Sequence, residues 1–155
     1  IVYLRAALPK VDDPDSTVGT EAARARAWLD IRKVRMHGRL KVELDVPEDV
    51  QDARLPPMVL LPLLDRAGAS VAGSPRPIES IAVAFAAADG RLRVCVSDSG
   101  RPRESTGADA AYAPIRERLA ALYGDQASLA VSSDMFRGTT AIAEVPHERH
   151  PGDHR

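Results

Sequence analysis

Three parts of the chain repeat apolar residues with the period of an α-helix. In the first, Thr17 is a residue type that caps helix N-termini, and an apolar face follows it as far as about Met36. That face consists of Val18, Ala22, Ala25, Leu29 and Met36. Trp28, Ile31 and Val34 widen it, so we expect this helix to bury two of its sides.

Two further helices are predicted with prolines near their starts, where a missing backbone N–H costs little. One begins at Pro56–Pro57 and runs to about Ser70, and Pro62 is expected to remove a backbone hydrogen bond and bend it. The other has Pro114 in its first turn and stops at Gly124. Its apolar face consists of Ile115, Leu119 and Leu122.

The remaining apolar residues alternate with polar ones, which is the pattern of half-buried β-strands. Residues 40–46 alternate most regularly. Two hairpins are also predicted: residues 81–85 with 92–96 around Asp89–Gly90, and 129–131 with 140–145 around 135–138. Helices and hairpins in one chain predict an α+β fold. We expect a two-layer sandwich in which about three helices cover one face of a mixed, mostly antiparallel sheet.

Composition narrows the class of protein. The chain has 155 residues, 45% hydrophobic and 28% charged, with a net charge of −1, so no strong basic field points to nucleic acid. No apolar run reaches the roughly 18 residues of a membrane-spanning helix. Because the sequence begins as if inside a helix, we expect a piece of a longer protein, whose membrane attachment lies outside this chain. We expect residues 1–16 to be a helix end and linker, 17–146 the domain, and 147–155 a disordered tail.

Five short segments then follow one another in an informative order. They are Leu29–Arg35 with Gly38-Arg39-Leu40, Val46-Pro47 with Leu55–Leu64, Val96–Gly100, Ile115–Leu119 with Leu122–Asp125, and Gly138-Thr139-Thr140 with Val145-Pro146. Each segment alone is a weak signal. In this order, over about residues 1–146, they resemble the ATP-binding domain of LytS-type sensor histidine kinases, a branch of the GHKL ATPase superfamily.

The resemblance implies a Bergerat-like fold that holds ATP beneath a lid. It also implies a phosphoacceptor His in an upstream dimerisation helix, and hence a homodimer formed through upstream helices. A response regulator is the implied partner, nucleic acid is not, and the chain is the implied cytoplasmic domain of a protein attached to the inner or plasma membrane.

The adenine end of the family's site has counterparts here. The Asp of the family's DxGxG box accepts a hydrogen bond from the adenine amino group, and Asp98 matches it. Gly100 matches the first glycine, which gives the backbone room beside the base. Thr139 or Thr140 is expected to support Asp98 through its hydroxyl. Taken alone, Asp-Ser-Gly is also a common plain turn after a strand.

The metal end of the family's site is altered. The family's N-box Asn, which binds Mg²⁺, is replaced by Arg66, and a guanidinium has no acceptor atom for a cation. We therefore expect Mg²⁺ to be absent and ATP to bind weakly or not at all. Asp65 keeps the acidic position of the general base, and a direct contact of Arg66 with phosphate is an alternative. The helix end Gly68-Ala69-Ser70 loses positive charge and carries a mid-helix glycine that costs about 1 kcal/mol.

The lid is altered as well. Pro102 replaces the second glycine of the DxGxG box, and Asp109, Ala111 and Tyr112 stand where the family has its Gly-x-Gly-Leu run. Gly107 is the glycine that remains nearby, at the phosphate end. A carboxylate at Asp109 repels a triphosphate, and alanine restricts the backbone of the lid.

Three hypotheses follow. The first is a pseudokinase-like regulatory module that keeps the scaffold and an adenine pocket, with weak or no ATP turnover. The second is an active histidine kinase domain with unexpected metal geometry, which phosphorylates an upstream His and then a LytTR-type response regulator. The third is a dimerisation domain that associates through residues 1–36. We assign no metal site to His147, His150 and His154, since no cysteine or carboxylate cluster completes them.

Overall fold

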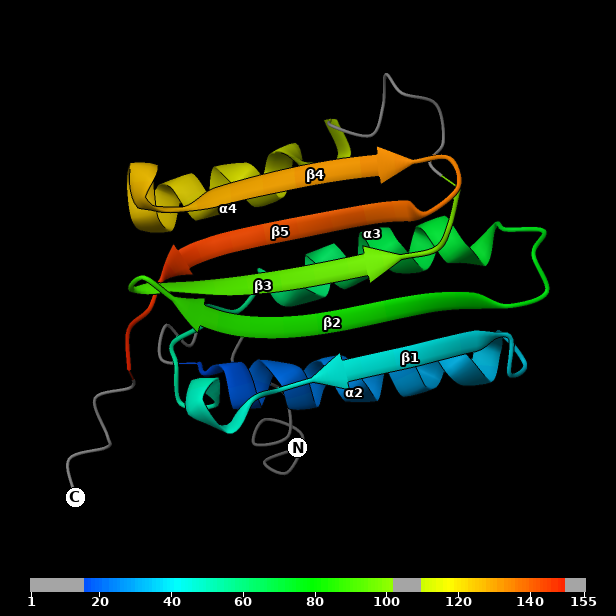
Figure 1. Ribbon diagram of the computed structural model, residues 1–155, viewed down its shortest axis with the longest axis horizontal. Coiled ribbons are helices and arrows are strands. Elements are labelled where there is room, and N and C mark those ends of the chain that lie inside the picture. Colours follow the sequence, from blue (N-terminus) through cyan, green and yellow to red (C-terminus); the bar gives the residue numbers. More distant parts are fainter. Residues whose placement is uncertain (1–15, 102–109, 150–155) are drawn as a thin grey trace, which may run out of the picture.

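The computed structural model describes residues 16–101 and 110–149 of the chain, which form two layers (Figure 1). One layer is a five-stranded sheet with the order β1-β2-β3-β5-β4. The strands are β1 (Leu40–Asp45), β2 (Glu79–Ala88), β3 (Arg91–Asp98), β4 (Ser128–Asp134) and β5 (Gly138–Pro146). The other layer holds α2 (Val18–Arg35), α3 (Leu60–Ala72) and α4 (Ala113–Tyr123). Short 3₁₀ turns are η1 (Glu48–Val50), η2 (Ala110–Tyr112) and η3 (Gly124–Gln126).

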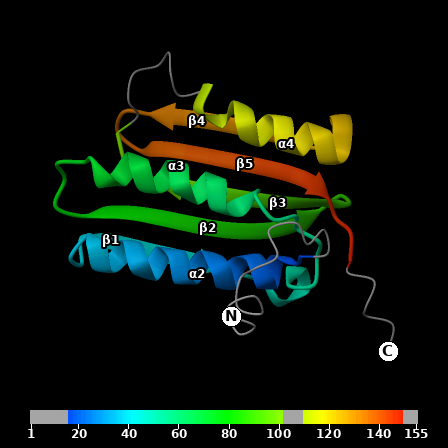
Figure 2. The ribbon, with the colours of Figure 1, turned by 180° about the vertical axis from the view of Figure 1, so that it is seen from behind.

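The sheet is mixed, and its helices lie on one face, as Figure 2 shows from behind. The β1–β2 pair is parallel, because α3 carries the chain back across the sheet, and the other three pairs are antiparallel. Asp89 (φ 55°) and Gly90 (φ 72°) make the tight turn between β2 and β3. The predicted α+β sandwich is therefore confirmed.

The core lies between the sheet and the helices. Alternate residues of β3 point into it, and Leu92, Val94 and Val96 are at most 3% exposed. From the helix layer, α3 buries five apolar residues, Leu60, Leu63, Leu64, Ala67 and Val71. None of the helices in the described ranges is long and apolar enough to cross a membrane.

The second predicted helix begins later than the prolines indicate. Residues 55–57 are buried but not helical, Met58 has a left-handed φ of 70°, and α3 starts at Leu60. Pro62 consequently falls in the first helical turn, where its missing N–H has no partner to lose. The predicted bend at Pro62 therefore has no cause.

Helix α2 buries less than its apolar pattern predicts. Thr17 caps it by accepting from the Thr20 backbone N–H, as expected. Ile31 and Val34, however, are 57% and 76% exposed, so the expected second buried side is wrong at these positions. In α4, Leu122 is likewise 44% exposed. A single helical layer leaves the outer side of each helix in solvent.

Gly68 of α3 makes room for the ring of Trp28 on α2. A Cβ added at Gly68 would lie 2.7 Å from Cη2 of Trp28, so the missing side chain permits close packing between the two helices. The same ring carries the guanidinium of Arg32 above it, 4.7 Å from the ring centroid. Gly68 therefore lowers helix propensity but allows α3 to pack closely against Trp28.

Gly68→Ala is expected to destabilise the domain by about 1–2 kcal/mol, because overpacking against Trp28 outweighs the better helix propensity of alanine. Urea unfolding followed by circular dichroism measures this change. Ala69→Gly, one position along on the exposed side of α3, is the matched control. A stabilised Gly68→Ala protein would mean that Trp28 moves aside at little cost.

The two ends of the described chain meet on one short segment. Residues 16–18 and residues 147–149 both hydrogen-bond to residues 53–55. The backbone bonds include Val18 N to Ala53 O (2.9 Å), Leu55 N to Ser16 O (3.0 Å) and Arg54 N to Glu148 O (2.7 Å). The predicted disordered tail is therefore wrong for residues 147–149, and residues 150–155 lie outside the described residues.

Candidate functional site

Asp98 is the last residue of β3, the central strand, and the chain leaves the sheet directly after it. Its side chain faces the helices and is 6% exposed. The Gly100 backbone N–H donates to its Oδ1 at 3.0 Å, and the Ser70 hydroxyl near the end of α3 also donates to the carboxylate. The acid predicted for the adenine end is thus buried, oriented from two sides, and attached to both layers of the fold.

Burial makes the Asp98 carboxylate an unusual acid. Desolvation raises its pKa from 3.8 to about 6, although the hydrogen bonds from Ser70 and Gly100 act in the opposite direction. The negative charge of Glu79 raises the pKa further. At neutral pH the group is still ionised, and it presents a poorly solvated acceptor to any amino group that reaches it.

Two glycines allow the backbone to pass close to Asp98. A Cβ at Gly100 would lie 2.2 Å from the Ser70 hydroxyl and 2.7 Å from its backbone, so only glycine fits against α3. A Cβ at Gly138 would lie 1.9 Å from the Asp98 carbonyl oxygen, and Gly138 has a φ of +92°. The absence of side chains at these positions lets β3, β5 and α3 converge on one point.

The two threonines predicted to support Asp98 lie on opposite faces of the sheet. Thr139 is opposite Asp98 in the β3–β5 register and is 8% exposed, but its hydroxyl bonds to Ser133 at 3.0 Å. Thr140 faces outward and its hydroxyl bonds to Ser97 at 3.3 Å. Thr140 is therefore not a support for Asp98, and Ser70 supplies the hydroxyl instead.

One side of α3 leads from Asp98 towards the start of that helix. Pro62, Arg66 and Ser70 are spaced four residues apart, so they lie on one side of the helix in successive turns. Arg66 is exposed. Tyr112 is buried close enough to Asp98 and Arg66 to be affected by their charges. Burial is the main cause of the raised pKa of Tyr112; the charge of Asp98 raises this pKa further, and that of Arg66 lowers it.

Beyond Arg66, the same side of α3 borders an apolar cleft of about 310 Å³. It lies between the first turn of α3 and helix α4, and it is lined by Met58, Pro62, Pro114, Ile115 and Arg118. A ligand bound at Asp98 and extending along α3 would therefore meet a carboxylate, then a cation, and then an apolar surface with a second cation at its edge.

Asp65 points away from this row of residues. Its carboxylate lies 3.7 Å from the guanidinium of Arg32 on α2, with 60% of its side chain exposed. The acid in the predicted general-base position is thus paired across the α2–α3 contact. Within residues 16–101 and 110–149, no group of three or more His, Cys, Asp or Glu side chains is placed to hold a metal ion.

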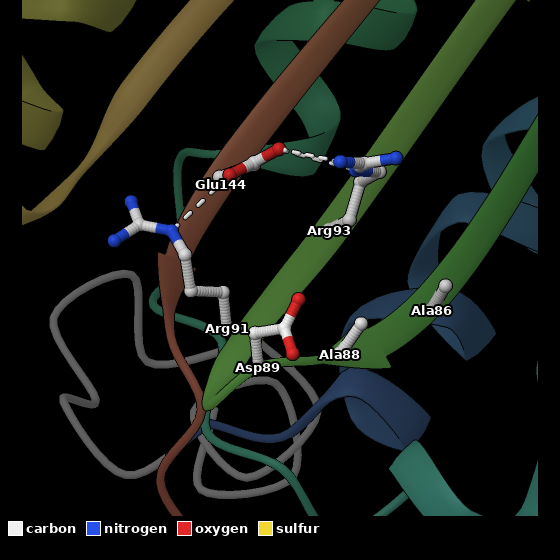
Figure 3. A pocket seen from close by; sticks show the side chains of 6 residues that line it. All are labelled: Ala86, Ala88, Asp89, Arg91, Arg93 and Glu144. Carbon is white, nitrogen blue, oxygen red and sulfur yellow. Dashed lines mark hydrogen bonds and ion pairs between the residues drawn. The ribbon is translucent and has the colours of Figure 1, made fainter.

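A second pocket lies on the opposite, uncovered face of the sheet. It has a volume of about 140 Å³ and is lined by Ala86, Ala88, Asp89, Arg91, Arg93 and Glu144 (Figure 3). Glu144 accepts from Arg93 at 2.8 Å and from Arg91 at 3.1 Å, and the Arg93 hydrogen bond is the main cause of a lowered pKa. Both arginines of this pocket pair with Glu144, so we assign the pocket no ligand.

The sequence predicts Asp98 and Gly100 as site residues, but it does not predict the side chains that hold them in place. By its position in the sequence Ser70 indicates only a lost positive charge, and no local motif indicates Glu79. Their contacts join residues far apart in the chain, which no local pattern encodes. Pro102, Gly107 and Asp109, which were expected to shape the lid, lie outside the described residues.

The chain is similar in sequence to two bacterial sensor proteins. No family model matches the chain. Sensor protein LytS of Bacillus subtilis (strain 168) is 26% identical over 164 residues, which covers 96% of this chain and 27% of LytS. Sensor histidine kinase YesM of the same organism is 30% identical over 138 residues, covering 84% of this chain and 24% of YesM. The chain thus spans about a quarter of the length of these relatives.

Several solved structures that share this fold are of histidine kinases. The catalytic domain of histidine kinase ThkA superposes with a TM-score of 0.62 at 15% identity, covering 85% of this chain and 94% of that domain. Full-length ShkA in complex with AMPPNP gives a TM-score of 0.60 at 18% identity, covering 86% of this chain and 31% of ShkA. The chain therefore has the fold of histidine kinase catalytic domains, and its sequence is similar, at modest identity, to part of the LytS and YesM sensor kinases.

Proposed function

We propose that this domain is a pseudokinase-like member of a two-component phosphorelay, which recognises adenine at Asp98 but binds the triphosphate weakly and without Mg²⁺. The observation that carries the proposal is Arg66, which stands at the family's metal-ligand position, on the same side of α3 as Ser70. The scaffold and the base end of the site are kept, whereas the metal end is replaced.

The chemistry of Arg66 opposes a divalent cation. A guanidinium offers only donors, keeps its positive charge at any physiological pH, and so neither ligates nor tolerates Mg²⁺ nearby. It can pair with one phosphate directly, which is the form of nucleotide contact this position supports. Arg66 is exposed, so such a contact is screened by water and salt and adds little affinity.

The position of Asp65 also supports impaired catalysis. A general base has to reach the attacking group within hydrogen-bonding distance. The Asp65 carboxylate is paired with Arg32 towards α2, on a different side of α3 from Arg66 and Ser70. Reorienting it would require breaking this ion pair and crossing the helix surface.

Isothermal titration tests the proposal with adenosine, ADP and ATP, each with and without Mg²⁺. We expect adenosine and ATP to bind within about tenfold of each other, weaker than about 100 μM, and without dependence on the metal. Arg66→Asn alone is expected not to restore Mg²⁺-dependent binding. Micromolar ATP binding that requires Mg²⁺ would contradict the proposal.

The competing function is an active kinase that phosphorylates an upstream His and then a response regulator. The AMPPNP complex of ShkA, which shares the fold, is the observation that favours it. Metal-dependent ATP binding together with phosphorylation of that His in the longer protein distinguishes the two functions. Under either function we propose that residues 17–146 form the ATPase-like domain of a dimeric, membrane-attached sensor that signals through a response regulator.

A further inference from the structure

A second buried carboxylate lies beside the adenine end of the site. Glu79 is the first residue of β2 and is 2% exposed, although a charged side chain is seldom buried without partners. Both of its oxygens are used: the Ser74 hydroxyl donates to Oε1 and the Ser99 hydroxyl donates to Oε2. These two serines come from the loop after α3 and from the turn after Asp98.

Each serine hydroxyl also accepts a backbone hydrogen bond. Ser80 N donates to the Ser99 hydroxyl at 2.8 Å, and Arg76 N donates to the Ser74 hydroxyl at 3.2 Å. Each hydroxyl hydrogen is therefore directed to Glu79, which has to accept on both oxygens. An ionised carboxylate does this, whereas a protonated one would lose one of the two bonds.

Ser99 is held through its backbone as well. Its N–H donates to the Ser80 carbonyl at 3.0 Å, and its own carbonyl accepts from the Arg76 guanidinium at 3.0 Å. Ser99 lies between Asp98 and Gly100, the two residues whose mutual hydrogen bond orients the acid. Its side chain and its backbone bonds together hold the turn that carries both of them.

We propose that Glu79 is a positioning residue for adenine recognition: through the hydroxyls of Ser99 and Ser74 it fixes the turn after β3, so that the Gly100 N–H meets Asp98 before a ligand arrives. This inference rests on the proposed binding of adenine at Asp98. It extends that function, because Glu79 at the start of β2 would hold the adenine end of the site rigid before a ligand binds.

The test compares Glu79→Ala, Glu79→Gln and Ser99→Ala by amide hydrogen exchange in ¹⁵N NMR spectra and by adenosine titration. In Glu79→Ala we expect the Gly100 amide to exchange at least about tenfold faster, and adenosine affinity to fall by about tenfold. Glu79→Gln keeps one acceptor oxygen and the size of the side chain, so it should lie between Glu79→Ala and the original protein in both measurements. Ser99→Ala leaves Glu79 in place and should reproduce the faster exchange at Gly100.

Glu43→Gln, an exposed substitution of the same kind on β1, is the control and should match the original protein. Unchanged Gly100 exchange in a folded Glu79→Ala or Ser99→Ala protein would overturn the proposal. If Glu79→Ala does not fold, Ser99→Ala decides the matter alone. The exchange measurement needs no ligand, so a protein that binds no adenosine would refute adenine binding while the role of Glu79 in holding Gly100 is still decided.

Discussion

At pH 7.5, Asp98→Asn is expected to raise the free energy of unfolding by about 3 kcal/mol while weakening adenosine binding by at least about tenfold. Burial lifts the pKa of Asp98 from 3.8 to about 6, so the ionised group is destabilising in the folded chain at neutral pH. A difference of about two pKa units, at about 1.4 kcal/mol each, gives this magnitude. An amide has no charge to desolvate and can still accept from Gly100 and Ser70.

The stability difference between the original protein and Asp98→Asn should depend on pH. The folded chain takes up the Asp98 proton at about pH 6, whereas the unfolded chain takes it up near 3.8. Lowering the pH through this window therefore stabilises the original protein relative to Asp98→Asn, and the advantage of the variant should shrink to nearly zero by about pH 4. Adenosine binding should fall over the same range, because a protonated acid no longer accepts from the base.

Urea unfolding at a series of pH values measures the stability change. Asp45→Asn, an exposed acid on β1, is the matched control, and it should change stability by less than about 0.5 kcal/mol at every pH. An Asp98→Asn protein that is less stable than the original at pH 7.5 would show that the carboxylate makes hydrogen bonds worth more than its desolvation costs.

Gly138→Ala is expected to destabilise the domain by about 3–5 kcal/mol, more than Gly68→Ala or Gly90→Ala. The added Cβ would lie 1.9 Å from the Asp98 carbonyl oxygen, and both partners are backbone in paired strands. The φ of +92° adds backbone strain to the clash. The strands can separate only by breaking hydrogen bonds at the end of β3, so the fold and the base end of the site should be lost together.

Gly90→Ala is the control that separates the clash from the backbone strain. Gly90 also has a positive φ, +72°, but nothing lies within 4 Å of its added Cβ. It should therefore cost only about 1 kcal/mol. Thermal unfolding followed by circular dichroism measures both variants, and equal losses for the two would show that the contact with Asp98 relaxes freely.

The sequence pattern predicted the order of the elements and the two-layer architecture, because period and turn chemistry are local properties. Thr17 as a helix cap and Asp89–Gly90 as a hairpin turn were confirmed for that reason. The pattern failed where tertiary contacts decide. Ile31 and Val34 have helical spacing, but no second layer covers them, so they are exposed.

The candidate site divides in the same way. Asp98 and Gly100 stand together in the chain and could be predicted from a short motif. Ser70 and Glu79 reach the same point from α3 and β2, and the contacts that bring them there span about 20 residues or more. A mid-helix glycine such as Gly68 reads as a defect until the Trp28 ring that it accommodates is known.

The meeting of residues 16–18 and 147–149, the two ends of the described chain, on residues 53–55 has a mechanical consequence. Strand β3 begins beside the Asp89–Gly90 turn, where His147 N bonds to Gly90 O at 2.9 Å, and it ends at Asp98 (β3 is labelled in Figure 1). A pulling force applied between residues 16 and 149 would load the few hydrogen bonds at 53–55 first. Until these bonds rupture they would carry the load between the two ends, so α2 and β5 would be stretched only after the contacts at 53–55 are broken.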